Sequence, residues 1–110
     1  MTKCNFVILS NPVAGREDEF NEWYTKQHLD DVLKVPGFVA AQRFKAQDPE
    51  NKLPHKYMAI YEMDTDDVQK ALDELASRAG TPEMFMSPSL DLDGVLAAVF
   101  DPITPRVLAK

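Results

Sequence analysis

The stretch Glu17–Gly37, EDEFNEWYTKQHLDDVLKVPG, predicts a helix with a defined beginning and end. Its first three residues are acidic, and negative side chains are favoured in the first turn, where the helix dipole is positive. Pro36 pushes the residue before it toward extended geometry, and Gly37 suits the left-handed conformation that follows a helix. We therefore expect a helix from Glu17 to about Lys34.

Four apolar segments and a second amphipathic segment accompany this helix. The expected strands are Cys4–Ser10, Phe38–Ala46, His55–Met63 and Gly94–Asp101. A second helix is expected between an N-cap at Thr65 and a stop at Gly80. The order β-α-β-β-α-β is typical of a ferredoxin-like α+β sandwich, in which two helices cover one face of a four-stranded antiparallel sheet. We expect one such domain over residues 1–110.

The predicted sheet has more apolar surface than two helices can cover. Two helices shield only one face, yet the first and last strands are apolar on both faces and the second nearly so. An exposed apolar face of this size is typical of an interaction surface. A second copy of the same sheet is the simplest cover, so we expect an obligate homodimer with its sheets packed face to face.

Composition excludes several classes of function. The 110 residues carry 12 Lys and Arg against 18 Asp and Glu, a net charge of −6, and lack the basic clusters that nucleic acid binding needs. No apolar run approaches the ~18 residues of a membrane-spanning helix, and the N-terminus lacks a secretion signal. The single cysteine, Cys4, excludes an internal disulfide. We expect a cytoplasmic protein that binds neither nucleic acid nor a membrane.

The first helix also carries the residues best suited to chemistry. An advance of ~100° per residue places one apolar stripe on this helix, comprising Phe20, Trp23, Tyr24, His28 and Asp31. Imidazole titrates near neutral pH, a nearby carboxylate fixes its tautomer, and a phenol donates to developing negative charge. His28 lies three residues from Asp31 and four from Tyr24, so each pair can touch. The pattern fits either a proton-transfer site or a packed histidine satisfied by Asp31.

Three residues outside this helix are further candidates. Arg43 suits a bidentate contact with a substrate carboxylate, an ion pair with Asp31 or Glu62, or a position that reaches the sheet edge. His55 is either a second base or a surface histidine at a strand entry. Phe85 lies between two methionines, in a segment that forms either an adaptable apolar lid or ordinary packing over the helix ends. The acidic residues lack the spacing of a calcium loop, so no metal site is expected.

Most of the first 45 residues carry a recognisable order of motifs. These are Asn11-Pro12, Gly15, Glu19-Phe20-Asn21, Trp23-Tyr24, His28, Val35-Pro36-Gly37, Ala41 and Arg43-Phe44. This order resembles the dimeric α/β-barrel superfamily, in particular its EthD-like branch. The signature of that branch is a phenylalanine, a Trp-Tyr pair and a histidine on the first helix, followed by Pro-Gly and an Arg-Tyr/Phe strand.

The resemblance implies a homodimer whose sheets form a central barrel, with ligand pockets between each sheet and its own helices. In many relatives it implies metal-free, cofactor-independent chemistry on aromatic, polyketide-like or ring-cleavage compounds, such as isomerisation, cyclisation, lactone chemistry or decarboxylation. Some relatives oxygenate quinols, and a few bind or degrade haem. The family's helix histidine corresponds to His28, with Tyr24 and Trp23 as pocket lining.

We therefore expect a cofactor-independent enzyme that acts on a small aromatic or dienoic acid. His28 would be the acid or base, supported by Tyr24 and Asp31. The expected substrate contacts are Trp23, Phe20, Arg43, His55 and Phe85. Two alternatives stay open, a non-catalytic dimeric binding or stress-accessory protein and a monooxygenase that handles haem or quinols.

Overall fold

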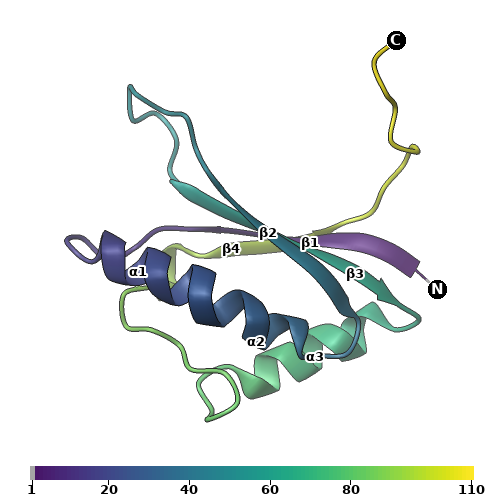
Figure 1. Cartoon of the computed structure of the whole chain (residues 1–110), viewed down its shortest axis with the longest axis horizontal. Coiled ribbons are helices and arrows are strands. Elements are labelled where there is room, and N and C mark those ends of the chain that lie inside the picture. Colours follow the sequence, from purple (N-terminus) through teal and green to yellow (C-terminus); the bar gives the residue numbers. More distant parts are fainter. Residues whose placement is uncertain (1) are drawn as a thin grey trace.

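The helices lie on one face of a four-stranded sheet in the computed structural model, which describes residues 2–110 (Figure 1). The strands are β1 (Thr2–Ser10), β2 (Phe38–Lys45), β3 (Tyr57–Thr65) and β4 (Leu96–Phe100). The helical elements are α1 (Glu17–Trp23), the π-helical turn η1 (Tyr24–His28), α2 (Leu29–Leu33), α3 (Val68–Arg78) and the 3₁₀ turn η2 (Leu92–Gly94). The spatial order β2-β3-β1-β4, antiparallel throughout, confirms the predicted ferredoxin-like α+β fold. Within residues 2–110, no helix combines the length and apolar character needed to cross a membrane.

The strand register fixes which side chains face the helices. Phe6 of β1 lies opposite Tyr61 of β3 and Val99 of β4, and Ala41 of β2 lies opposite Tyr61 on its other side. Because side chains alternate along a strand, these positions share the face that the helices cover. Tyr61 and Phe20 of α1 are fully buried there. The core therefore forms between the sheet and α1, where the candidate residues also lie.

The element boundaries differ from the predicted ones where tertiary pairing decides them. β3 extends to Thr65 because that residue pairs with the start of β1, so Thr65 does not cap the following helix. Asp67 caps α3 instead, accepting a hydrogen bond of 3.0 Å from the backbone N–H of Lys70. The last strand begins at Leu96 rather than at residue 94, because residues 92–94 form η2.

Gly37 joins the first helix to β2. Its φ of +103° is a conformation that other residues rarely adopt. A Cβ atom at this position would lie 3.2 Å from the Cβ of Ala71 on α3 and 3.3 Å from the Cβ of Thr65. The glycine therefore provides both the turn and the close approach that bring β2 under α3.

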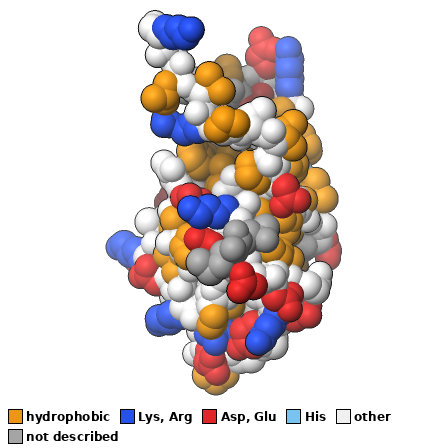
Figure 2. Space-filling view, turned by 90° about the vertical axis from the view of Figure 1, so that its right-hand side faces the viewer, with side chains coloured by type: hydrophobic (Ala, Val, Ile, Leu, Met, Phe, Trp, Pro, Cys, Tyr) orange, Lys and Arg blue, Asp and Glu red, His pale blue; other side chains and the backbone are white. Residues whose placement is uncertain are grey.

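The sheet face opposite the helices is apolar and uncovered. By the same alternation it carries one continuous set of aliphatic and aromatic side chains, Val7, Leu9, Phe44, Met58, Ile60, Leu96, Ala98 and Phe100. Leu96 and Phe100 of β4 each keep 58% of their surface exposed. Figure 2 views the molecule from the side and shows orange side chains gathered below two projections at the top. We call this surface the open face.

Candidate functional site

The π-helical turn η1 shapes the candidate site. It spans Tyr24–His28, at the centre of the segment predicted as one continuous α-helix. Such wider turns are rare and often occur at functional sites. Both ends of η1 are buried, with Tyr24 exposed by only 3% and His28 by 6%, whereas the three residues between them are exposed. The turn therefore directs a phenol and an imidazole into the same aromatic environment.

His28 is a buried imidazole held between aromatic rings. Its ring stacks on Trp23 at a centroid distance of 4.6 Å and meets the Tyr24 ring edge to face at 4.9 Å. The Nδ1 atom is buried without a hydrogen-bond partner among residues 2–110. Nε2 also lacks a partner in this part of the chain but is not fully buried, so solvent reaches it.

Burial sets the protonation state of this imidazole. It lowers the pKa of His28 to about 4, while the nearby Asp31 carboxylate acts in the opposite direction. His28 is therefore neutral at physiological pH, with one ring nitrogen free to accept a proton.

Asp31 and Tyr24 lie beside His28 without bonding to it. Asp31 is 8% exposed, and its Oδ1 lies 3.7 Å from Nζ of Lys34. The Tyr24 hydroxyl accepts a long hydrogen bond of 3.3 Å from Tyr61 on β3. Burial raises the pKa of both tyrosines, so both hydroxyls stay protonated. The structure thus brings the three predicted catalytic residues together, with electrostatic rather than hydrogen-bonded coupling between His28 and Asp31.

Arg43 of β2 also contacts the Tyr24 ring. Its Cζ atom lies 4.6 Å from the Tyr24 ring centre, 5.3 Å from that of Tyr57 and 5.4 Å from that of Phe20. Over residues 2–110 no carboxylate comes within 4.0 Å of the guanidinium, so the ion pairs considered with Asp31 and Glu62 are both wrong. Glu62 does not pair with Arg43 because side chains alternate along β3, and this alternation directs Glu62 to the open face.

Two neutral side chains of the first helix accept hydrogen bonds from the Arg43 guanidinium. Nη1 donates to Oγ1 of Thr25 at 2.8 Å, and Nη2 donates to Oδ1 of Asn21 at 2.9 Å. Burial lowers the pKa of Arg43, although not enough to discharge it. A half-buried cation that meets only neutral acceptors and aromatic faces has an electrostatic preference for an anion.

A polar chain connects Arg43 to a cavity at the end of the sheet. Asn21 donates to the Tyr57 hydroxyl at 3.1 Å, and that hydroxyl donates to Oε2 of Glu17 at 2.5 Å. Lys56 completes the chain with Nζ 3.2 Å from the same oxygen. The hydrogen bond from Tyr57 is the main cause of a lowered pKa at Glu17. Glu17 and Lys56 line a cavity of about 780 Å³ between residues 11–17 and the hairpin loop 45–56.

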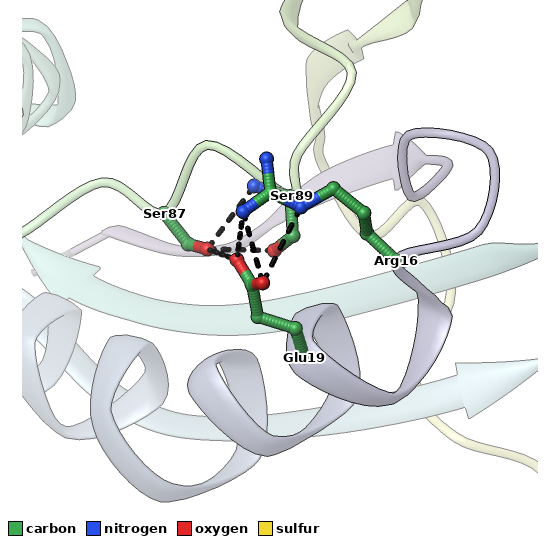
Figure 3. Close-up of polar contacts among 4 residues, drawn as sticks. All are labelled: Arg16, Glu19, Ser87 and Ser89. Carbon is green, nitrogen blue, oxygen red and sulfur yellow. Dashed lines mark hydrogen bonds and ion pairs between the residues drawn. The ribbon is translucent and has the colours of Figure 1, made fainter.

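The segment after α3 lies against Trp23. The indole Nε1 donates to the backbone oxygen of Phe85 at 3.0 Å, while the Phe85 ring itself stays half-exposed. Figure 3 shows what fixes this segment to α1. Ser87 donates to Oε2 of Glu19 at 3.2 Å and lies 2.6 Å from the Ser89 hydroxyl, and Arg16 forms a bidentate pair with the same carboxylate. The segment is thus anchored by polar contacts and not by apolar packing alone.

His55 lies apart from His28. Its Nε2 is 2.7 Å from the backbone oxygen of Gly94. It lines a hollow of about 200 Å³ together with Leu9 and Phe44, which belong to the open face. The structure therefore places His55 at the sheet face opposite the site, while Phe20, Trp23 and Arg43 cluster around Tyr24 and His28. Among residues 2–110 no three His, Cys, Asp or Glu side chains are arranged to hold a metal ion.

Sequence reasoning missed the tyrosines and the polar partners of this site. Tyr57 and Tyr61 alternate along β3 with the period of a half-buried strand, a signal that places them on one face but does not say which face. Asn21 and Thr25 follow the apolar stripe at helical spacing, so their proximity to Arg43 depends on how the helix crosses β2.

Comparison with solved structures finds the same fold in other proteins. A proposed monooxygenase from Shewanella loihica PV-4 matches with a TM-score of 0.65 at 14% identity, over 94% of this chain and 97% of that chain. The haem degrader MhuD from Mycobacterium tuberculosis gives 0.62 at 17% identity, over 94% and 99%. An EthD family protein from Bacillus halodurans gives 0.53 at 14% identity, over 91% and 99%.

A dimeric ferredoxin-like protein from Jannaschia sp. matches with a TM-score of 0.55 at 17% identity, over 91% of this chain and 99% of that chain. No protein-family profile and no curated protein matches this chain. The chain therefore has the fold of the ferredoxin-like dimeric α/β-barrel proteins, including an EthD family protein, which confirms the resemblance at the level of the fold.

Proposed function

We propose that the protein is an enzyme that performs acid–base chemistry, without a bound cofactor, on small aromatic or dienoic organic acids such as polyketide-like or ring-cleavage products. One observation carries the proposal: His28 is a neutral, buried imidazole with one nitrogen unpaired inside and the other reached by solvent. Titratable groups perturbed in this way by an aromatic environment are typical of functional sites. The fold relatives include a proposed monooxygenase and a haem degrader, so the reaction is argued from the residues rather than from them.

His28 would transfer the proton through Nε2. A neutral imidazole removes a proton from carbon beside a substrate carbonyl and returns it at another atom, which achieves isomerisation, cyclisation or loss of a leaving group. The protonated Tyr24 hydroxyl would donate to the oxyanion that develops on the carbonyl. Asp31, whose charge raises the pKa of His28, would stabilise the transient imidazolium.

Arg43 would hold the carboxylate of the substrate. Among residues 2–110, two of its five N–H donors have acceptors, the Thr25 hydroxyl and the Asn21 amide oxygen. A carboxylate would complete the guanidinium with charge-assisted hydrogen bonds. Because Arg43 and His28 both contact the Tyr24 ring, one small molecule beside that ring would reach both groups.

We infer that the working form is a homodimer. The open face is the largest apolar surface that the register defines, and it is uncovered within one chain. The dimeric relative from Jannaschia sp. shows that this fold supports a dimer. Two open faces packed together would bury the exposed side chains of β4 from both copies and leave each His28 site on the outer side of its own sheet.

The single tryptophan gives a direct test of the ligand class. Trp23 stacks on His28, so a ligand at the site is expected to change its fluorescence. We expect aromatic or dienoic carboxylic acids to bind at least ~10-fold more tightly than their neutral amides, because only the acids pair with Arg43. Arg43→Met should abolish this preference, and Lys26→Met, which removes an exposed cation from the same helix, should keep it. Equal acid binding by the Arg43→Met variant and the wild type would contradict the assignment.

One observation favours a rival function, non-catalytic binding of the same acids. Neither Tyr24 nor Asp31 is hydrogen-bonded to His28, so the imidazole is not oriented by either residue before a ligand arrives. Proton NMR of a bound acid in D₂O separates the two functions. Protein-dependent exchange of deuterium into a C–H beside the carboxylate or carbonyl indicates catalysis, and binding without exchange indicates the rival.

Haem, the ligand of the Mycobacterium tuberculosis relative, represents the other alternative, a monooxygenase that handles haem or quinols. The Trp23 and Tyr24 rings contact the imidazole at 4.6 and 4.9 Å, so haem ligation by His28 would require one of these rings to move. A Soret band of the protein with added haem would support this alternative, and its absence would favour the small acid.

A further inference from the structure

The last ten residues form an exposed arm that carries apolar side chains. Residues 101–110 follow β4 and contain no helix or strand. Ile103 keeps 96% of its surface exposed, Val107 82% and Leu108 66%. Three aliphatic side chains exposed to this extent within six residues are unfavourable in water, because each leaves apolar surface hydrated. The arm therefore has the composition of a segment that packs against another surface.

The arm does not fold back onto its own sheet. Figure 1 shows it in yellow, rising from the sheet on the side opposite the helices. Pro102 and Pro105 lack backbone N–H groups, so the arm cannot continue the ladder of β4 in a regular way. Its root lines a hollow of about 500 Å³ at the end of the sheet, where Pro102, Pro105 and Arg106 face Val39 and Glu62. The three exposed aliphatic residues are not part of this lining.

The geometry of the open face indicates what covers the arm. The arm and the hairpin loop between β2 and β3 both project beyond the open face, on the same side of the sheet (Figure 1). Sheets that pack face to face lie ~10 Å apart, and an extended chain of ten residues spans up to about 33 Å. In the proposed dimer, each arm would therefore cross the interface and continue along the other copy.

Charge places the root of the arm at its own sheet and leaves its apolar side chains for another surface. Glu62 and Asp64 alternate along β3 on the open face, and both line the hollow at the end of the sheet together with Lys3 and Arg106 of the same chain. Arg106 therefore has its acidic neighbours within its own subunit. Ile103, Val107 and Leu108 do not line this hollow, and under two-fold symmetry they meet the apolar surface of the other copy.

We propose that residues 101–110 form a clasp that packs against the partner protomer of a homodimer, with Ile103, Val107 and Leu108 as its apolar contacts. This inference rests on the homodimer inferred above. It adds a specific segment of the chain to that interface and assigns a role to an arm that makes no core contact in its own subunit.

The test compares matched charge substitutions within the arm by sedimentation equilibrium. Ile103→Asp and Val107→Asp each place a charge at an apolar contact, and Ala109→Asp places the same charge at a small exposed neighbour that does not line the hollow. Burial of an aliphatic side chain changes an association constant by roughly 10- to 100-fold, and each substitution occurs twice in a dimer. We expect the dimer dissociation constant to rise at least ~10-fold for the first two variants and less than ~3-fold for Ala109→Asp.

A photo-crosslinking residue at position 107 supplies the second readout. We expect a covalent dimer from position 107 and none from position 70, where Lys70 lies on the exposed side of α3. A wild-type dimer that is unaffected by Ile103→Asp and gives no crosslink from position 107 would overturn the clasp and leave the homodimer standing. A wild-type protein that is monomeric at micromolar concentration would overturn both inferences.

Discussion

Replacement of His28 by glutamine is expected to lower turnover by roughly 10²- to 10⁴-fold on an acid that the wild-type enzyme converts. Glutamine keeps the approximate size and polarity of the side chain but cannot take up a proton. The substitution removes the only imidazole near Tyr24, since His55 lies at the opposite sheet face. The dimer should be unchanged, because His28 lies on the helix-covered side of the sheet. The measurement is kcat, followed by NMR of the substrate.

A matched control separates this effect from general disturbance of η1. Lys26→Gln changes an exposed residue of the same turn, whose side chain pairs only with Glu22 at 3.6 Å among residues 2–110. It should retain wild-type turnover. If His28→Gln is as active as Lys26→Gln, the proton is transferred by another group, and the catalytic role of His28 is wrong.

The second large effect concerns stability at low pH. The unfolded chain protonates His28 near pH 6.5, whereas the folded protein does so only near pH 4. Between these values the unfolded state binds more protons, so the free energy of unfolding falls as the pH drops from 6.5 toward 4. Protonation of His28 should thus account for about 3 kcal/mol of the stability lost over this range.

Urea unfolding at several pH values between 4 and 7 measures this contribution. The carboxylates titrate in both the wild type and His28→Gln, so the difference between the two curves isolates the histidine. We expect the wild type to lose about 3 kcal/mol more than the variant between pH 7 and pH 4. Parallel curves would show that His28 is protonated equally easily in the folded and unfolded states, contrary to its burial in the structure.

The sequence predicted the fold and the buried stripe of the first helix because both depend on local periodicity. Phe20, Trp23, His28 and Asp31 repeat at helical spacing, and the structure buries all four. The strand ends were less accurate, because ladder partners decide them: the pairing of Thr65 with the start of β1 moved the cap of α3 to Asp67.

The rest of the site depends on tertiary contacts that no local pattern contains. The hydrogen bonds of Arg43 reach residues 18 and 22 positions earlier in the chain, so they follow from the way the helix crosses β2. The π-helical turn is also invisible in the sequence, since nothing in YTKQH differs from an ordinary helical segment. The neutral state of His28 arises from its burial among the surrounding rings, and the pairing of β3 with β1 places Tyr61 beside Tyr24.

The central claim is that His28 is a neutral imidazole in a site tuned to bind organic acids. NMR titration of both imidazoles, assigned with His28→Gln and repeated with saturating aromatic or dienoic acids, tests it most directly. Our account predicts a His28 midpoint near pH 4 in the free protein, which rises when an acid binds because the carboxylate favours the imidazolium. A midpoint near 6.5 that no acid changes would contradict the claim and identify His28 as a residue of packing alone.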